Sequence, residues 1–457
     1  MKARTHSGGR RPAVCNWAWN PYGGAEFARD AECSSIVTTP LLEQVLAREN
    51  LRQAWERVRA NRGAPGIDGV SIADFPDITR PHWTSILESL RSGAYRPQPV
   101  RRVEIPKAGG GCRPLGIPTV LDRVIQQAMS QVLLPMFDPQ MSPYSFAYRP
   151  GRSAHDAVRH IQSGIQADKT WAIDLDLSKF FDRVDHDLLM ARVSRRVHDH
   201  RVLRLIGRYL RSGVSIDGRL QATPLGVPQG GPLSPLLANI MLDDLDQELT
   251  RRGHWFARYA DDVVILVSSK PAAQRVMSNI RDFVERRLKL VVNETKSRVV
   301  RSTQAEFLGF TFPRGKVRWS ESRYQDFRYN IRKLTGRSRG ISFKTRLVEL
   351  NRYLRGWMGY FRLSKYFRPM EGIDHWIRRR LRMCRLKTWR YVRTRVSKLL
   401  AMGVPRKEAL STGSSSKSCW RLAKTVAVNM AMNNSWFAEQ GLVSVKQLWV
   451  SFHYPQG

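Results

Sequence analysis

Three acidic residues in this sequence have the type and placement that metal-dependent phosphate chemistry requires. Asp176 ends a segment, 170–177, in which apolar residues alternate with acidic ones, the pattern of a half-buried strand. Asp261 and Asp262 are adjacent within 256–267, which is typical of two short strands joined at the Asp pair. Such carboxylates repel one another unless cations lie between them. A pair of divalent ions held there activates an attacking oxygen and stabilises a leaving phosphate oxygen. Mg²⁺ is the expected ion, and a solvated turn is the structural alternative for an isolated Asp pair.

A glycine-rich segment with a cation at each end is a candidate triphosphate site. Lys107 and Arg113 stand six residues apart, and the segment between them could fold over a triphosphate on the side away from the metals. An ordinary basic hairpin would have the same residues. The alternating residues 100–106 predict a strand that leads into it.

Two further segments could contact a nucleotide. Within 227–235, Gln229 offers hydrogen bonds, and Gly230 lets the backbone approach a ligand closely. Phe181 follows Asp176 closely enough to lie beside the bound ligand, where an aromatic ring could exclude a ribose 2′-hydroxyl. Each has a structural alternative, since the first could be a loop before a helix and a Phe-Phe pair is more often core.

The hydrophobic pattern predicts strands and helices that alternate as far as residue 317 and helices beyond it. The region before residue 318 is therefore expected to be α+β. Beyond it, an apolar stripe covers 347–361, and another helix is expected after Asp374, a candidate N-cap, with apolar steps as far as Leu399. The helices expected in the α+β region are 41–62, 119–137, 152–168, 236–249 and 271–288. Residues 1–40 are expected to be a poorly ordered arm, and residues 411–418 a linker or loop.

The charge of the chain indicates a polyanionic partner. Over 457 residues the net charge is +37, while the hydrophobic fraction of 42% remains that of a folded protein. Arginine supplies 59 of the 76 basic residues, and its planar fork binds phosphate in two places, which favours nucleic acid over a membrane surface. Residues 301–457 alone carry 33 basic and 8 acidic side chains. The five cysteines are scattered, which fits a reducing cytoplasm, and no apolar run is long enough to span a membrane.

Taken together, these residues resemble a group II intron-encoded reverse transcriptase and maturase. The resemblance covers about residues 45–400. Its blocks occur in the order known for that family: Gly66–Gly69, Ile105–Lys107, Arg113–Pro118, Tyr148–Ser153, Asp176–Asp182, Pro228–Pro235, Arg258–Asp262, Asn293–Lys296 and Leu308–Phe310.

The resemblance implies an α+β right-hand polymerase followed by an α-helical thumb, the maturase domain X. Fingers and palm would occupy 41–317, the thumb 318–420 and a C-terminal tail 421–457. The tail's apolar residues predict that it packs or docks. Residues after 401 contain one Cys and one His, so the family's nuclease domain with its His and Cys cluster is not expected.

The resemblance also assigns roles in RNA-templated DNA synthesis from deoxynucleoside triphosphates. Two Mg²⁺ ions, or Mn²⁺ as a substitute, would be held by the three aspartates with the carbonyl of Leu177 as a further ligand. Lys107 and Arg113 would clasp the triphosphate, Gln229 with Gly230 would contact the nucleotide, and Phe181 would be the sugar gate.

The implied macromolecular partners are the intron RNA, an RNA template with a DNA primer, and a target DNA. The arginines of the helical region are the expected RNA contacts, and binding should depend steeply on salt. These candidates are Arg352, Arg355, Arg378, Arg379, Arg382 and Arg385. A thumb that grips only the primer and template is compatible with the same charges.

Two other functions remain open from the sequence. One is a stand-alone or defence-associated reverse transcriptase of the retron or diversity-generating kind. The other is an RNA-splicing chaperone without polymerase activity. The three aspartates argue against the chaperone, because a protein that only binds RNA has no physical need for clustered carboxylates.

Overall fold

The computed structural model describes residues 39–106 and 112–455. The expected arm at 1–40 lies outside these ranges except for its last two residues, and most of the glycine-rich segment lies outside them too. No helix in the described ranges is long and apolar enough to cross a bilayer.

The first helical segment is broken where one helix was expected. It forms α1 (Leu41–Leu46) and α2 (Arg48–Ala60), with Ala47 between them in an extended conformation at ψ 135°. Asn50 Nδ2 donates to Val45 O at 2.8 Å and to Ala128 O at 3.1 Å, so the side chain satisfies a carbonyl at the break and ties it to α5 (Val120–Phe137). The shorter α3 (Phe75–Thr79) and α4 (Trp83–Arg91) follow.

A four-stranded sheet contains the expected strand at 100–106. Its order is β2-β1-β4-β5, formed by β1 (Val100–Pro106), β2 (Cys112–Ile117), β4 (Val214–Ile216) and β5 (Arg219–Gln221). Strands β1 and β2 pair in antiparallel register, which confirms the predicted hairpin on either side of the glycine-rich segment. Strand β1 also pairs in parallel with β4, about 110 residues further along the chain, so the hairpin is joined to the rest of the fold.

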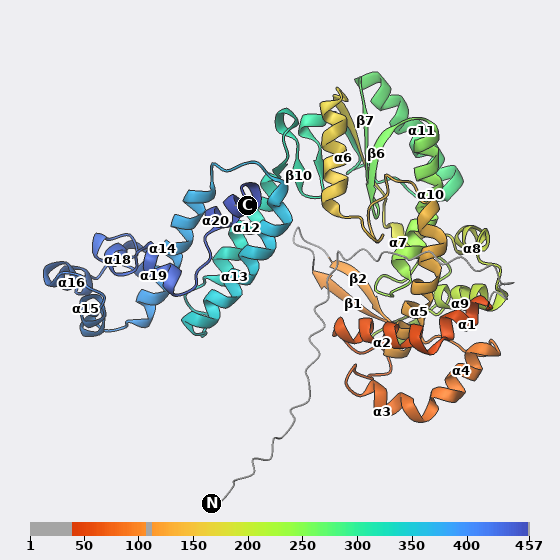
Figure 1. Cartoon of the computed structure of the whole chain (residues 1–457), viewed down its shortest axis with the longest axis horizontal. Coiled ribbons are helices and arrows are strands. Elements are labelled where there is room, and N and C mark those ends of the chain that lie inside the picture. Colours follow the sequence, from red (N-terminus) through yellow and green to blue (C-terminus); the bar gives the residue numbers. More distant parts are fainter. Residues whose placement is uncertain (1–38, 107–111, 456–457) are drawn as a thin grey trace, which may run out of the picture. The chain divides into compact units, whose positions relative to one another are not determined.

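A second four-stranded sheet carries the acidic residues, in the order β6-β7-β3-β8. It consists of β3 (Trp171–Asp176), β6 (Trp255–Tyr259), β7 (Asp262–Val267) and β8 (Arg298–Arg301), so the expected strands at 170–177 and 256–267 are confirmed. Helix α6 (Ala154–Gln166) packs on one side of it and α11 (Lys270–Leu288) on the other (Figure 1). Successive residues of β7 enter different cores: Val263 and Ile265 join one cluster, Val264 and Leu266 the other. A sheet with both faces buried is held firmly in place.

After β3, four helices connect the two sheets within the described residues. The loop after β3 leads into α7 (Phe180–Arg183), α8 (His186–Ser194) and α9 (His200–Leu210). The expected helix after the Gln229 loop is present as α10 (Ser234–Arg251). Its buried residues include Leu237, Met241 and Leu245, spaced to put one apolar face against the core.

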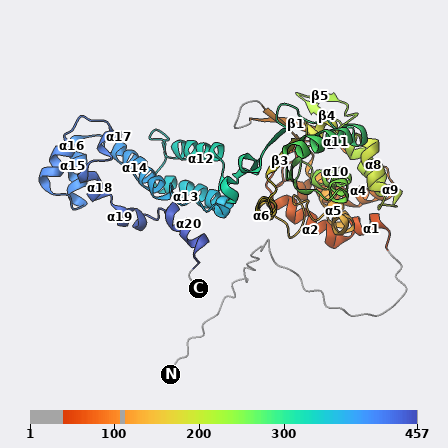
Figure 2. The ribbon, with the colours of Figure 1, turned by 90° about the horizontal axis from the view of Figure 1, so that it is seen from above.

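Beyond residue 319 the described chain is helical, as the sequence predicts. Short strands β9 (Glu306–Phe307), β10 (Phe310–Thr311) and β11 (Arg318–Trp319) precede it. Figure 2 shows the helices in cyan to blue. They are α12 (Glu321–Leu334), α13 (Phe343–Tyr360), α14 (Met370–Thr388), α15 (Val392–Ala401), α16 (Arg406–Gly413), α17 (Cys419–Leu422), α18 (Val426–Ala431), α19 (Asn434–Glu439) and α20 (Val445–His453).

The prediction of an N-cap at Asp374 is wrong. Asp374 lies inside α14, and its carboxylate accepts hydrogen bonds from Ser444 Oγ at 2.6 Å, Val445 N at 2.8 Å and Lys446 N at 3.1 Å. It therefore satisfies the first N–H groups of α20, a different helix 70 residues away in sequence.

Three further predictions for the helical region concern the length of the helix that contains Asp374, the loop at 411–418 and the packing of the tail. The helix expected to continue to Leu399 ends at Thr388, and α15 starts after an extended Tyr391. Residues 414–418 form a loop as expected, while residues 411–413 belong to α16. The tail packs as predicted, since Trp449 is buried and its Nε1 donates to Ser364 O at 3.0 Å.

Candidate active site

The fold brings the three predicted acidic residues to one cleft. In the pairing of β3 with β7, Asp176 lies directly opposite Asp262, and Asp261 lies in the turn between β6 and β7. Residues directly opposite each other in an antiparallel pair project from the same face of the sheet. All three line a cleft of about 1360 Å³.

The electrostatics of the cleft favour a cation. Surrounding protein desolvates the Asp262 carboxyl although solvent reaches it through the cleft, and the neighbouring Asp261 and Asp176 repel its charge. The pKa of Asp262 is raised by these effects, from 3.8 to about 6. Desolvation also raises the pKa of Asp174, two residues before Asp176, against the opposing effect of Arg298 at 3.3 Å.

The donor set fits a Mg²⁺ site that is completed by ligands from outside the protein. Within the described ranges, no group of three or more His, Cys, Asp and Glu side chains is gathered closely enough to hold a metal ion. Mg²⁺ is commonly held by one or two carboxylates, with waters and substrate phosphates as its other ligands. The opposed Asp176 and Asp262 provide that minimum at the cleft.

Asn293 holds the Asp176 carboxylate in place, a role that the sequence did not reveal. Its Nδ2 donates to Asp176 Oδ2 at 2.8 Å, and its backbone N donates to Asp176 O at 2.8 Å. Ser297 Oγ accepts from Asp176 N at 3.1 Å, and Lys296 Nζ lies 3.8 Å from Asp176 Oδ2. The motif Asn293–Lys296 was visible in the sequence, but nothing in it indicated which distant residue it contacts.

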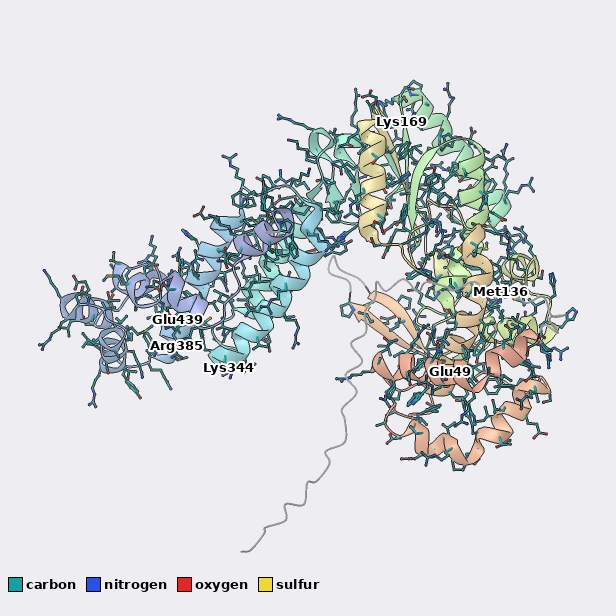
Figure 3. The ribbon with its side chains drawn as sticks, in the orientation of Figure 1. Glu49, Met136, Lys169, Lys344, Arg385 and Glu439 are labelled. Carbon is teal, nitrogen blue, oxygen red and sulfur yellow. The ribbon has the colours of Figure 1, made fainter. Side chains whose placement is uncertain are left out.

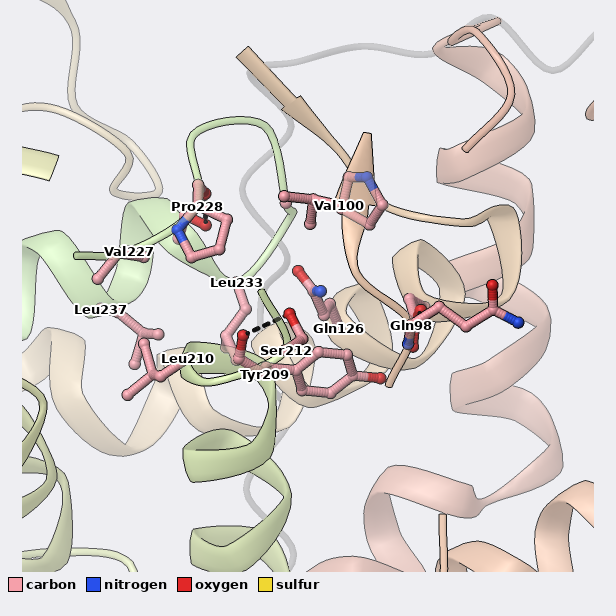
Figure 4. Close-up of a pocket in the computed structure, with 14 residues that line it drawn as sticks. Gln98, Val100, Gln126, Tyr209, Leu210, Ser212, Val227, Pro228, Leu233 and Leu237 are labelled. Atoms are coloured by element: carbon pink, nitrogen blue, oxygen red, sulfur yellow. Dashed lines mark hydrogen bonds between the residues drawn. The ribbon is translucent and has the colours of Figure 1, made fainter. Parts of the chain in front are cut away.

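The expected nucleotide-binding loop meets the β2 strand backbone to backbone. Gly116 N donates to Gln229 O at 2.7 Å, and Gly230 has a left-handed φ of +123°. A Cβ added at Gly230 would lie 2.4 Å from Gly116 O, so only glycine permits this approach. Val227 and Pro228, at the start of the loop, line a small pocket together with Val100 of β1 (Figure 4).

Most of the predicted nucleotide-site residues share the cleft with the aspartates. Leu177, Phe181, Gln229 and Gly230 all line it. Phe181 is half-buried and meets Phe180 edge to face, with ring centroids 5.1 Å apart. Lys107 lies outside the described residues. The structure gives the position of Arg113 only through its backbone, which pairs with Ile105 in the β1–β2 hairpin.

One of the six predicted RNA-contacting arginines is not on the surface. Arg382 is buried, and its Nε and Nη2 donate to Met432 O at 2.9 and 2.8 Å, so the prediction of a surface contact there is wrong. Met432, between α18 and α19, and Phe437 on α19 lie against Arg382, which the periodicity of α14 cannot reveal. Arg352 and Arg355 are exposed on α13, and Arg378, Arg379 and Arg385 are partly exposed on α14, where Figure 3 labels Arg385.

The chain combines an α+β palm, in which two paired strands bring aspartates to a cleft, with a helical region that follows it. This arrangement is that of the right-hand nucleic-acid polymerases. Residues 105–312 match the family model described as reverse transcriptase (RNA-dependent DNA polymerase). Residues 324–400 match the model described as group II intron, maturase-specific domain. The chain belongs to the family of reverse transcriptases that carry this maturase domain.

Two curated relatives illustrate the range of similarity. Protein YkfC of Escherichia coli is 33% identical over 324 residues, which are 62% of this chain and 85% of that protein. Group II intron-encoded protein LtrA of Lactococcus lactis is 28% identical over 340 residues, 60% of this chain and 56% of that protein. Among solved structures, a partial Cas6-RT-Cas1–Cas2 complex matches 54% of this chain and 43% of that chain, with 24% identity and a TM-score of 0.36.

Proposed function

We propose that this protein is an RNA-directed DNA polymerase whose reaction takes place at the cleft between β3 and β7. The observation that carries the proposal is the register that sets Asp176 opposite Asp262, beside Asp261. A primer 3′-oxygen would attack the α-phosphate of an incoming deoxynucleoside triphosphate, and most of the rate would come from positioning and charge stabilisation.

The residues that would hold two Mg²⁺ ions, or Mn²⁺ in their place, are Asp176, Asp261 and Asp262, with the Leu177 carbonyl as a further ligand. When bound, these ions stabilise the charge that develops on the attacking and leaving oxygens. Asn293 keeps the Asp176 carboxylate directed by its 2.8 Å hydrogen bond, so that this ligand is ordered before the substrate arrives.

The remaining residues of the cleft would bind and select the nucleotide. Gln229 and Gly230 would contact it, and Lys107 with Arg113 would neutralise its triphosphate. Phe181, half-buried on α7 beside Asp176, would exclude a 2′-hydroxyl by steric contact. Replacing Phe181 with Ala should therefore raise ribonucleotide incorporation more than it changes deoxynucleotide incorporation.

We also propose that the helical region binds the intron RNA and assists its splicing. The match to the maturase-specific domain over 324–400 supports this, together with the excess of basic over acidic residues after residue 301. We assign fingers and palm to 41–317, thumb and domain X to 318–420 and the tail to 421–457. Mobility of the intron into target DNA and a cytoplasmic location stay predictions.

Primer extension separates the proposed polymerase from a splicing chaperone. Purified protein with poly(rA), oligo(dT), dTTP and Mg²⁺ should make DNA, and Asp261→Ala should abolish synthesis while splicing of the flanking intron RNA is still assisted. The control is Asp187→Ala, which removes an exposed carboxylate on α8. Wild-type protein that assists splicing but makes no DNA would refute the polymerase. A short structured non-coding RNA crosslinked to the protein in place of an intron would favour the retron alternative.

A further inference from the structure

A buried ion pair lies behind the turn that carries Asp261 and Asp262. Arg258 on β6 and Asp246 on α10 are both fully buried, with Arg258 Nη2 2.5 Å from Asp246 Oδ2 and Nε 2.8 Å from Oδ1. Burial of two charges is costly, and it is tolerated when the remaining hydrogen-bonding groups of both side chains are satisfied.

The remaining N–H groups of the guanidinium also donate hydrogen bonds, and their acceptors lie in three different regions of the fold. Nη1 donates to Asn239 Oδ1 at 2.9 Å and to Ala260 O at 3.0 Å. Nη2 also donates to Ser145 Oγ at 2.7 Å. Because the fork is planar and rigid, the two-pronged contact with Asp246 and the bond to Asn239 leave it a single orientation, in which Nη1 faces the Ala260 carbonyl.

That carbonyl belongs to the peptide bond that leads into Asp261. Ala260 has a φ of +58°, in the left-handed region that residues other than glycine rarely adopt. A strained residue persists only where its surroundings hold it. The Arg258 side chain supplies one such restraint, and the β6–β7 pairing of Tyr259 with Asp262 closes the turn from the other side.

Arg258 is also anchored through its backbone. Arg258 N donates to Tyr144 O and Phe146 N donates to Arg258 O, both at 2.9 Å, so the segment 144–146 lies alongside β6. Arg149 Nη1 donates to Ser145 O at 3.1 Å and fixes that segment from its other side. Arg258, which directly precedes the turn at 259–262, therefore cannot shift without breaking several buried hydrogen bonds at once.

We infer that Arg258, held by Asp246, is a positioning residue for the polymerase reaction: it fixes the Ala260–Asp261 peptide and thereby the places of the Asp261 and Asp262 carboxylates. It touches neither substrate nor metal. The inference rests on the proposed function, since it names what sets the geometry of that site. The competing interpretation is that the pair only fastens α10 to β6.

Arg258→Lys, with Asp246→Asn as a second variant, distinguishes the two interpretations. Lysine keeps a charge beside Asp246 but lacks the second arm that reaches Ala260 O, and asparagine removes the charge that orients the guanidinium. Ser145→Ala is the matched control, because it removes one hydrogen bond from the same buried guanidinium and leaves the Nη1 bond to Ala260 intact.

The measurements are kcat and KM in primer extension, primer–template affinity, melting temperature, and Mn²⁺ binding followed by the electron spin resonance signal of free Mn²⁺. In Arg258→Lys and Asp246→Asn, kcat should fall by about 10-fold or more and Mn²⁺ binding should weaken by about fivefold, the size expected when one buried positioning contact is lost. KM and primer–template affinity should change little. Ser145→Ala should lower the melting temperature while it retains kcat and Mn²⁺ affinity.

Each other outcome decides against the inference. If the folded Arg258→Lys and Asp246→Asn proteins had wild-type kcat and Mn²⁺ affinity, the turn at Ala260–Asp261 would keep its conformation without the Arg258 contact. An equal loss in Ser145→Ala, or failure of both variants to fold, would assign the pair a purely structural role. Wild-type protein without any DNA synthesis would refute the proposed function, and the Mn²⁺ binding data would still report on the turn.

Discussion

Removal of the Asn293 side chain should slow DNA synthesis without unfolding the palm. Asn293→Ala deletes the hydrogen bond from Nδ2 to Asp176 Oδ2 but leaves the backbone bond from Asn293 N to Asp176 O. A hydrogen bond to a charged group contributes about 1.5–3 kcal/mol. If that contribution serves to direct the carboxylate, kcat/KM should fall by about 10- to 100-fold, because each 1.4 kcal/mol corresponds to a factor of ten.

The assay is single-nucleotide extension of a DNA primer on an RNA template at saturating Mg²⁺, with the melting temperature measured beside it. Thr295→Ala is the control, because its hydroxyl donates to Asn293 Oδ1 at 2.8 Å and its loss leaves the bond to Asp176 in place. Its kcat/KM should stay within about threefold of the wild type. A folded Asn293→Ala protein with undiminished kcat/KM would refute the reasoning that Asp176 needs this partner.

Three further predictions concern the loop, the tail and the pH dependence. Gly230→Ala should raise the KM for the nucleotide by about tenfold, since its strain is of order 1–3 kcal/mol. Gly218→Ala is the control: it is also at positive φ, but no atom lies within 4 Å of the added Cβ, so KM should stay unchanged. Equal KM values in both variants would contradict the close contact at Gly230. Asp374→Ala should lower the unfolding free energy by about 2 kcal/mol in urea titrations, because two N–H groups of α20 lose their acceptor, while Glu371→Gln, an exposed change on α14, should not. In the absence of metal, the raised pKa of Asp262, about 6 against 3.8 unfolded, means that protonation of this carboxyl stabilises the fold. That stability should be complete below about pH 4 and lost as pH rises to about 6. Urea midpoints in EDTA should show this pH-dependent loss in the wild type and lack it in Asp262→Asn.

The candidate active site was largely predictable because its strands have strong local patterns. Alternation of apolar and acidic residues ending at Asp176, and two apolar runs meeting at Asp261, predict both the strands and the turn. The pairing of β3 with β7 confirms that these residues meet. The hairpin of β1 and β2 was predictable for the same reason, since 100–106 alternates and a glycine-rich segment follows.

What the sequence did not predict depends on partners distant along the chain. The break at Ala47 involves the contact of Asn50 with Ala128, and Asp374 looks like an N-cap of its own helix but caps α20 instead. Arg382 has the spacing of a surface residue, yet Met432 and the helices around it cover it. Helical periodicity says which residues share a face and says nothing about what lies against that face.

The backbone contact between Gly116 and Gln229 couples any movement of the β1–β2 hairpin to movement of the loop at 227–235. With no side chain between the two backbones, and with a 2.7 Å hydrogen bond across them, neither can slide without the other. A tilt of the β1–β2 hairpin toward an incoming triphosphate would carry Gln229 along. At the proposed nucleotide site, a poorly fitting nucleotide that displaced the hairpin would therefore displace Gln229 as well, so that one misfit would weaken two of the proposed contacts.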